Sequence, residues 1–223
     1  VDNTMGYPLI SFYLYGFELK RALEILTSVR PLKSNNDYYL QVSGLRFTYN
    51  PRRVYFDRVT AIEIGSEEEG YRPLDYSRSN RQLYRVAANI YNATFLKNVG
   101  RFTYSLLEII PKDKNGKPVE KLSAALVDGD PSLPGIQELK EWEGVLQYVQ
   151  SFPDTNGNGI PDVPAKYSGK LGRIVEKPSC NPVHLFSRPA IPTIIVLAAA
   201  GVVLLLIVAA VMVRKGRRLK TEG

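Results

Sequence analysis

Tyr38–Asn50 reads Tyr-Tyr-Leu-Gln-Val-Ser-Gly-Leu-Arg-Phe-Thr-Tyr-Asn, and it is the most informative stretch of the chain. Its side chains alternate between two faces, as those of a β-strand do. One face carries most of the rings: Tyr39, Gln41, Ser43, Leu45, Phe47 and Tyr49. Aromatic and β-branched residues are common in any strand, so the simplest interpretation is a sheet strand over 38–49 with one well-packed face.

The segments around this stretch predict further strands and a helix. Pro8–Tyr15 is a dense apolar and aromatic run of strand length, and Phe17–Thr27 has apolar residues at the i, i+3, i+4 and i+7 spacing of a helix. Strand patterns follow at Arg58–Ile64 and Leu83–Ile90, with another candidate at Tyr104–Ile110. Elements in this order predict an α+β fold, in which a mixed sheet is layered with helices.

An apolar stripe predicts one more helix, over Pro134–Gln150, near the end of the folded domain. We expect its apolar side chains to pack in the core: Ile136, Leu139, Trp142, Leu146 and Val149. Residues 152–190 contain many Pro, Gly and Ser residues and little periodicity, which is typical of a stalk. The sequence therefore predicts a domain over 1–151 followed by a stalk over 152–190.

Residues 191–213 contain no charged side chain and predict a transmembrane helix. Such a helix would extend about 34 Å, which is enough to cross a bilayer. Five basic residues follow in the tail over 214–223, and clusters of this kind stay on the cytoplasmic side. We therefore expect a single-pass protein of the cell membrane, with an extracytoplasmic folded domain and a cytoplasmic C-terminus.

A folded domain outside the cytoplasm has to be exported. Val1–Met5 has neither the basic start nor the apolar core of a secretory signal. We therefore expect this chain to be the C-terminal piece of a longer protein.

The charge and the histidine content argue against two broad classes of function. The formal net charge is +7, but the tail after Val213 has five basic residues and one acidic residue, which leaves +3 on the rest. A nucleic-acid-binding protein concentrates positive charge on its folded surface, so we expect no nucleic-acid partner. The single histidine, His184, lies just before the apolar run and has no second histidine to help it hold a metal. We assign no catalytic residue in this chain.

Residues 154–162, Asp-Thr-Asn-Gly-Asn-Gly-Ile-Pro-Asp, have the spacing of a calcium-binding loop. The candidate ligands are the side chains of Asp154, Asn156, Asn158 and Asp162 and the carbonyl of Ile160. Ala165 stands where such loops usually place a Glu, which predicts weak affinity suited to the higher calcium concentration outside cells. The alternative is a Gly-rich turn leading into the stalk, and the sequence leaves both open.

Three segments together carry a resemblance to a known family. They are Leu14-Tyr-Gly-Phe-Glu-Leu19 with Leu23-Glu24 after it, Tyr39-Leu-Gln-Val-Ser-Gly-Leu-Arg-Phe47, and Tyr84-Arg-Val-Ala-Ala-Asn-Ile-Tyr91. In order and spacing, residues 5–110 resemble the C-terminal domain of the 5′-nucleotidase and UDP-sugar hydrolase family. In that family an N-terminal metallophosphoesterase domain holds two metal ions and hydrolyses the substrate, while the C-terminal domain binds its nucleoside part.

The resemblance implies two substrate-binding residues in this chain. The aromatic residue before Leu-Gln-Val-Ser-Gly stacks on the base in the family, and here it is Tyr39. The second stacking aromatic falls on Tyr91. Two rings on either side of a flat base are physically sensible, because each stacking contact contributes roughly 1–3 kcal/mol. The chain departs from the family where Gly-Gly-Asp-Gly usually follows, so the resemblance implies no ribose ligand here.

Two functions are therefore expected. The first is the nucleoside-binding part of a cell-surface phosphohydrolase that acts in nucleotide catabolism, whose catalytic metal ions lie in a separate N-terminal domain. This chain alone would then not be catalytic, although its parent protein would be a hydrolase. The alternative is a non-catalytic surface binding module stabilised by calcium at residues 154–162.

Overall fold

The structure is a computed structural model that describes residues 5–29, 40–102 and 107–221. Its first layer is a two-stranded antiparallel sheet of β1 (Leu9–Tyr15) and β5 (Leu83–Asn89). Every second residue of β1 is buried, as the alternating apolar pattern predicts. α1 (Gly16–Val29) follows β1 without a loop, and α2 (Ile90–Phe102) follows β5 in the same way.

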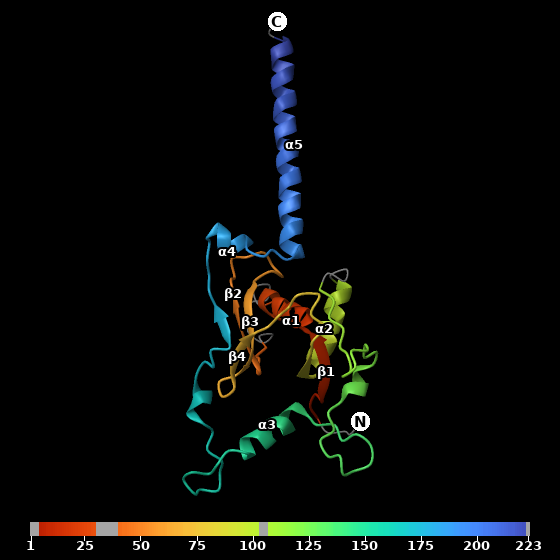
Figure 1. Cartoon of the computed structure of the whole chain (residues 1–223), viewed down its shortest axis with the longest axis vertical. Coiled ribbons are helices and arrows are strands. Elements are labelled where there is room, and N and C mark those ends of the chain that lie inside the picture. Colours follow the sequence, from red (N-terminus) through yellow and green to blue (C-terminus); the bar gives the residue numbers. More distant parts are fainter. Residues whose placement is uncertain (1–4, 30–39, 103–106, 222–223) are drawn as a thin grey trace.

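The second sheet has four strands in the order β4-β3-β2-β6. They are β2 (Leu45–Tyr49), β3 (Val59–Ser66), β4 (Gly70–Pro73) and β6 (Ile174–Glu176). The β2–β3 and β3–β4 pairs are antiparallel, whereas β2 and β6 are parallel. Two sheets, one of them mixed, packed with helices confirm the α+β prediction (Figure 1).

The hydrophobic core lies between α1 and the two sheets. Most of its buried side chains come from β1, α1, β2 and β3: Ile10, Phe12, Leu14, Leu19, Leu23, Ile25, Leu26, Phe47, Tyr49, Val59 and Ile62. The others are Leu74, Ala93 of α2, Leu107 and Ile109. The buried Glu24 lies among them, and its carboxylate accepts from the backbone N–H of Arg58 (2.6 Å) and Val59 (3.0 Å) and from Lys20 Nζ (2.6 Å). These bonds tie α1 to the start of β3 and so hold the helix against the second sheet.

A buried ion pair joins α1 to the segment after α2. Lys112 Nζ lies 2.6 and 2.7 Å from the two carboxylate oxygens of Glu18 and also donates to the carbonyl of Ile110 at 2.6 Å. Glu18 in turn accepts from the backbone N–H of Tyr15 at 2.9 Å, in the first turn of α1. With its donors filled and its charge paired, Lys112 is buried beside the core.

The expected strand over 38–49 is shorter than the alternation predicts. Residues 38–39 lie outside the described residues, residues 40–44 bend without sheet pairing, and β2 begins at Leu45. Gly44 explains the break, because its φ of 73° is a left-handed conformation that favours glycine. Residues 107–110, the described part of the candidate strand at 104–110, form no strand either.

The helix predicted over 134–150 begins only at the Lys140 cap, so that α3 covers Glu141–Gln150. The residues before it are extended, with single bridges from Asp128 to Glu138 and from Pro8 to Lys140. None of the residues of α3 is buried, and Trp142 is 45% exposed. The expectation that this apolar stripe packs in the core is therefore wrong, and the stripe is a surface feature.

The chain then returns along the second sheet to the base of the last helix. Two short 3-10 turns, Leu122–Ala125 and Ala165–Ser168, precede α3 and β6. After β6, Tyr49 Oη donates to Glu176 Oε2 (2.6 Å), and Asn50 exchanges hydrogen bonds with the backbone of Ser179 (3.0 and 3.1 Å). The second half of the segment expected to form a stalk therefore packs against β2.

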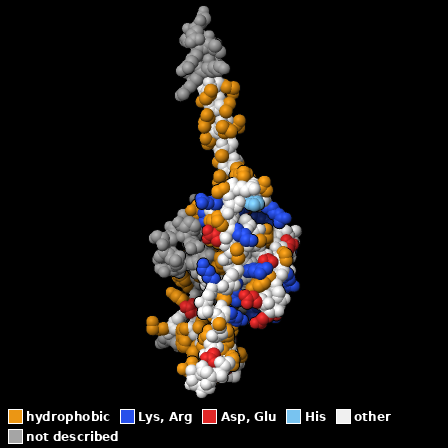
Figure 2. All heavy atoms as spheres, turned by 90° about the vertical axis from the view of Figure 1, so that its left-hand side faces the viewer, with side chains coloured by type: hydrophobic (Ala, Val, Ile, Leu, Met, Phe, Trp, Pro, Cys, Tyr) orange, Lys and Arg blue, Asp and Glu red, His pale blue; other side chains and the backbone are white. Residues whose placement is uncertain are grey.

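α4 (Pro182–Phe186) leads into α5 (Ile191–Thr221), which projects away from the folded part as a single long helix (Figure 1). Over residues 191–213 the side chains on its surface are mostly hydrophobic (Figure 2). Residues 191–213 are long and apolar enough to cross a membrane, and the apolar window within them is not buried against the rest of the chain. A core helix of this length would be covered by other elements, whereas this helix is open to its surroundings.

Candidate functional site

A cavity of about 390 Å³ lies where residues 40–45 meet α1, β5 and α2. We call it the motif cavity, because the Leu-Gln-Val-Ser-Gly segment and the start of α2 both line it. Its wall is mostly apolar, with a few polar side chains that include Gln41, Ser43 and Asn92. A cavity of this size and composition is typical of a small-molecule site.

Backbone hydrogen bonds hold the Leu-Gln-Val-Ser-Gly segment in place on one side of the cavity. The carbonyl of Gly44 accepts from the N–H of Gly65 at 3.0 Å, and the carbonyl of Val42 accepts from Arg173 Nη1 at 3.2 Å. Gly65 is required at its position, because a Cβ there would lie 2.0 Å from the carbonyl oxygen of Gly70. The left-handed Gly44 then turns the chain from the cavity wall into β2.

The other side of the cavity is set by the direct joint between β5 and α2. Asn89 Oδ1 accepts from the N–H of Asn92 at 2.8 Å, which caps the free donors of the first turn of α2. The Asn89 Nδ2 group donates to Glu141 Oε2 at 2.7 Å and so ties this turn to α3. Asn92 and Leu96, one turn apart on α2, are thereby aimed at residues 40–45 across the cavity.

Tyr91, one of the two predicted stacking residues, lies in the first turn of α2 but does not line the motif cavity. Its side chain is 54% exposed, and its ring lies 5.4 Å from that of Tyr7 at an interplanar angle of 32°. Tyr39 lies outside the described residues, so its pairing with Tyr91 stays a prediction. Sequence reasoning missed Tyr7, because a single ring just before a strand has no periodic signal.

Tyr91 and Tyr7 belong to a larger exposed area, the N-terminal aromatic surface, made of Met5, Tyr7, Tyr91 and Trp142. Trp142 Nε1 donates to the carbonyl of Met5 at 2.9 Å, and the carbonyl of Tyr7 accepts from the N–H of Glu141 at 3.0 Å. All four side chains are exposed. A contiguous exposed apolar area of this kind is typical of a surface that contacts another protein or domain.

In the predicted calcium loop the side-chain oxygens accept hydrogen bonds from N–H groups of the loop's own backbone. Asp154 accepts from the N–H of Gly157 and Gly159 (both 2.8 Å), and Asp162 accepts from the N–H of Thr155 (2.8 Å). Asn156 and Asn158 accept in the same way from Asn158 and Ile160. The bond from Gly159 first, and then those from Gly157 and other N–H groups, lowers the pKa of the Asp154 carboxyl, and the bonds from Thr155 lower that of Asp162. Both carboxylates are therefore charged at neutral pH.

The described residues contain no cluster of three or more His, Cys, Asp or Glu side chains placed to hold a metal ion. Calcium at residues 154–162 would use amide and carbonyl oxygens besides its two carboxylates, and it stays a prediction. Nothing in the described part of the chain resembles the two-metal centre of a phosphohydrolase.

The sequence model of the family described as 5′-nucleotidase, C-terminal domain matches residues 3–102. That range contains both sides of the motif cavity and ends with α2. No curated protein sequence matches the chain.

Solved structures with a similar arrangement include three bacterial proteins. The 5′-nucleotidase precursor of Thermus thermophilus is 24% identical, with a TM-score of 0.45 over 77% of this chain and 25% of its own. NAD nucleotidase (NadN) of Haemophilus influenzae is 20% identical, with a TM-score of 0.35 over 45% of this chain and 17% of its own. Sulfate thiohydrolase SoxB of Thermus thermophilus, solved with glycerol, is 21% identical, with a TM-score of 0.34 over 78% of this chain and 22% of its own.

This chain spans a quarter or less of the length of each of these structures. Over residues 3–102 the chain is similar to the family described as 5′-nucleotidase, C-terminal domain.

Proposed function

We propose that this chain is the nucleoside-binding part of a membrane-anchored nucleotidase-type phosphohydrolase. Its motif cavity, together with Tyr39 and Tyr91, holds the base and sugar of a nucleotide. Hydrolysis of the phosphate takes place in a separate domain that carries the metal ions. The family of residues 3–102 supports a nucleotide as ligand and a metal-bearing domain as partner.

The observation that carries the proposal is the shared lining of the motif cavity. Residues 40–45 and residues 84–88 are about forty residues apart in the sequence, and they belong to two separate motifs. In the structure both border one cavity of about 390 Å³. Apolar walls suit the flat faces of a base, and the side-chain amides of Gln41 and Asn92 supply both donors and acceptors for its edge.

The N-terminal aromatic surface is where we propose that the metal-bearing domain contacts this one. Tyr91 is part of this surface and belongs to the same helix as Asn92 and Leu96 of the cavity wall. A domain seated there would cover exposed rings and bring its metal ions near the mouth of the cavity. The ring of Tyr91 would then be shared between the ligand and the domain contact.

The last helix anchors the protein in this proposal. α5 has the length and the apolar surface of a membrane span, and the basic residues after Val213 favour a cytoplasmic C-terminus. The folded part would then face the outside of the cell.

Calorimetric titration of the full chain in detergent with adenosine monophosphate tests the binding role. We expect weak binding without turnover, and a loss of about 5- to 150-fold in affinity for Tyr39→Ala and for Tyr91→Ala, because each stacked ring contributes roughly 1–3 kcal/mol. Tyr71→Ala is the matched control and keeps wild-type affinity, because Tyr71 lies on β4, which contributes no residue to the cavity, whereas Tyr91 lies on α2 next to Asn92 of the lining. Turnover by the purified chain, or equal losses in all three variants, would refute the proposal.

The second candidate is a non-catalytic surface module stabilised by calcium. It is favoured by the Asp154 and Asp162 carboxylates, whose lowered pKa values keep them charged in an exposed loop. In that case calcium raises the melting temperature of the chain while adenosine monophosphate has no effect. The opposite pattern supports the nucleotidase proposal.

A further inference from the structure

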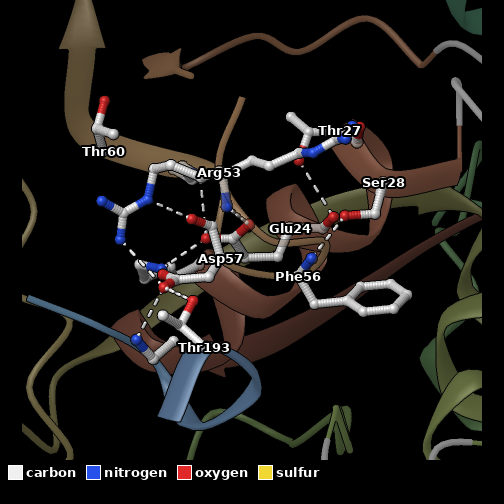
Figure 3. Close-up of polar contacts among 12 residues, drawn as sticks. Glu24, Thr27, Ser28, Arg53, Phe56, Asp57, Thr60 and Thr193 are labelled. Carbon is white, nitrogen blue, oxygen red and sulfur yellow. Dashed lines mark hydrogen bonds and ion pairs between the residues drawn. The ribbon is translucent and has the colours of Figure 1, made fainter. Parts of the chain in front are cut away.

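The folded part is fastened directly to the first turn of α5 by the buried carboxylate of Asp57. Its Oδ2 accepts from Thr193 Oγ1 at 2.5 Å and from the N–H of Ala190 at 3.0 Å (Figure 3). Arg53 Nη2 lies 3.0 Å from the same oxygen. Arg53 also donates to the carbonyls of His184 (2.7 Å) and Ser187 (3.0 Å), so Arg53 holds the α4 end of the connection to α5 and Asp57 holds its α5 end.

These bonds leave no free linker between the domain and the apolar helix. Thr193 is fully buried, whereas Ile194 is already 51% exposed. The apolar surface of α5 therefore starts within one turn of the domain. Where α5 enters a bilayer, the part of the domain around its base lies at the headgroup level.

A pocket of about 240 Å³ opens at this level, between α5 and the start of α1. We call it the helix-base pocket. One side is apolar and belongs to the first turns of α5, with Ile191 and Ile194. The other side carries Phe17, Arg21, Tyr76 and Arg78. Lys and Arg side chains also lie on the surface of the folded part close to the base of the helix (Figure 2).

The two arginines of the helix-base pocket bring positive charge that the chain itself does not fully neutralise. Their guanidinium carbons lie 5.4 Å (Arg21) and 6.0 Å (Arg78) from the centre of the Phe17 ring. Burial and then the nearby charge of Arg78 lower the pKa of Arg21, while Glu18 and Glu108 offset part of this effect. Glu18 is itself paired with Lys112.

The hydrogen bonds in the helix-base pocket leave donors of the Arg21 and Arg78 guanidinium groups available for a ligand. Arg21 donates to the carbonyl oxygen of Glu108 at 2.6 Å and not to a carboxylate. Within the described residues, Arg78 has no hydrogen bond or ion pair, and Lys20, the third cation of the lining, is paired with Glu24 at 2.6 Å. Two neighbouring guanidinium groups with open donors match the oxygens of a phosphate.

We propose that the helix-base pocket binds the phosphodiester headgroup of a membrane phospholipid, with Arg21 and Arg78 on the phosphate and Ile191 and Ile194 beside the acyl chains. The proposal rests on the proposed insertion of α5 in a membrane. A lipid is favoured over free phosphate because the apolar half of the pocket is continuous with the apolar surface of α5. The Asp57 contacts keep this half and the two arginines at a fixed separation.

Native mass spectrometry of the full chain in detergent, titrated with phosphatidylglycerol, tests this site. We expect one tightly retained lipid, and about tenfold weaker retention for Arg78→Gln, the loss of one charge-assisted hydrogen bond. Arg78→Gln removes no hydrogen bond or ion pair among the described residues and only the contact with the Phe17 ring, so its folding is not at risk. Arg21→Gln adds to the loss, and Arg72→Gln on β4, the matched control, retains the lipid as the wild type does.

Unchanged retention in Arg78→Gln, or an equal loss in Arg72→Gln, would overturn the proposal. Inorganic phosphate is titrated in a second arm. Arginine-dependent binding of phosphate without any retained lipid assigns the pocket to a free anion and also overturns the lipid proposal. Retention of lipid at phosphate concentrations that saturate this arm supports it.

Alkaline extraction of membranes separates this proposal from the anchoring of the chain. The Arg21→Gln/Arg78→Gln variant stays in the membrane pellet when α5 is inserted, even though its specific lipid is lost, and this result supports both proposals. Release of the wild-type chain by alkali refutes the anchoring, and the lipid proposal fails with it because it rests on that anchoring.

Discussion

Replacing Asp57 by alanine tests whether the folded part and α5 form one unit. The side chains of Arg53 and Asp57 are only 3% and 1% exposed. The variant leaves a buried guanidinium without its carboxylate and removes the acceptor of Thr193 Oγ1 and of the Ala190 N–H. Removing one partner of a buried pair costs about 3–5 kcal/mol. We expect the lower end, because Arg53 keeps its bonds to the carbonyls of His184 and Ser187.

Thermal unfolding of the full chain in detergent measures this cost. About 3 kcal/mol lowers the melting temperature by roughly 6–12 °C for a domain of this size. Hydrogen exchange at the Ala190 amide should accelerate in parallel, since this N–H loses its acceptor. Both changes together indicate that the helix base has loosened.

Two further variants control this experiment. Asp75→Ala removes an exposed aspartate that accepts only from its own loop, and it should change the melting temperature little. In a double-mutant cycle, Asp57→Ala combined with Arg53→Met should cost less than the sum of the single changes, because no unpaired charge remains. A melting temperature for Asp57→Ala no lower than that for Asp75→Ala would refute the reasoning.

Three further predictions concern single residues. Burial raises the pKa of Glu24 above its ordinary value of 4.5; its contribution to stability is therefore present below that value and lost as pH rises through the folded-state pKa. The free energy of unfolding measured against pH should show this loss in the wild type and not in Glu24→Gln. The pH dependence of the difference between wild type and variant should have the opposite sign for Glu63→Gln, because Arg46 lowers the pKa of Glu63. Calorimetry at millimolar calcium should show weak binding that Asp154→Ala abolishes and Asp130→Ala, in another exposed turn, leaves intact; no heat from the wild-type chain would contradict the calcium loop. Leu23→Ala, in the core side of α1, should lower the free energy of unfolding by about 2–5 kcal/mol, and a loss much smaller than this range would contradict the assigned core.

Local periodicity was sufficient to predict the elements that bury one face. The alternation of apolar residues predicts β1, and the spacing of the leucines predicts α1. In each of these two elements the apolar face that the pattern predicts is buried. The same reasoning failed for α3, because an apolar stripe shows which side of a helix avoids water without showing what covers it. Trp142 and its neighbours on α3 are exposed in this chain.

Contacts between distant residues could not be predicted from the sequence. Nothing in the residues around Asp57 indicates that its carboxylate meets Thr193, which is more than a hundred residues away. The pairing of β6 with β2 is similar, since Ile174–Glu176 is too short to show a strand period among prolines and glycines. Segments rich in Pro and Gly are typical of a stalk, yet here such a segment completes a sheet.

The candidate site residues stay a prediction. Residues 40–45 and 84–88, which belong to two separate motifs, border the motif cavity, but Tyr91 does not line it and Tyr39 lies outside the described residues. The motifs did not indicate Tyr7, which contacts Tyr91 through folding of the chain around the start of β1. The helix-base pocket was also missed, since its arginines and its apolar side come from three separate segments.

Mapping of amide chemical shifts on addition of adenosine monophosphate tests whether the motif cavity holds a nucleotide. The largest shifts should fall together on residues 40–45 and on Asn92 and Leu96 of α2, the two sides of the motif cavity. Amides of α3 and β4 should move little. Shifts confined to other surfaces, or no shift at ligand concentrations in the millimolar range, would contradict the assignment of this cavity to a nucleotide.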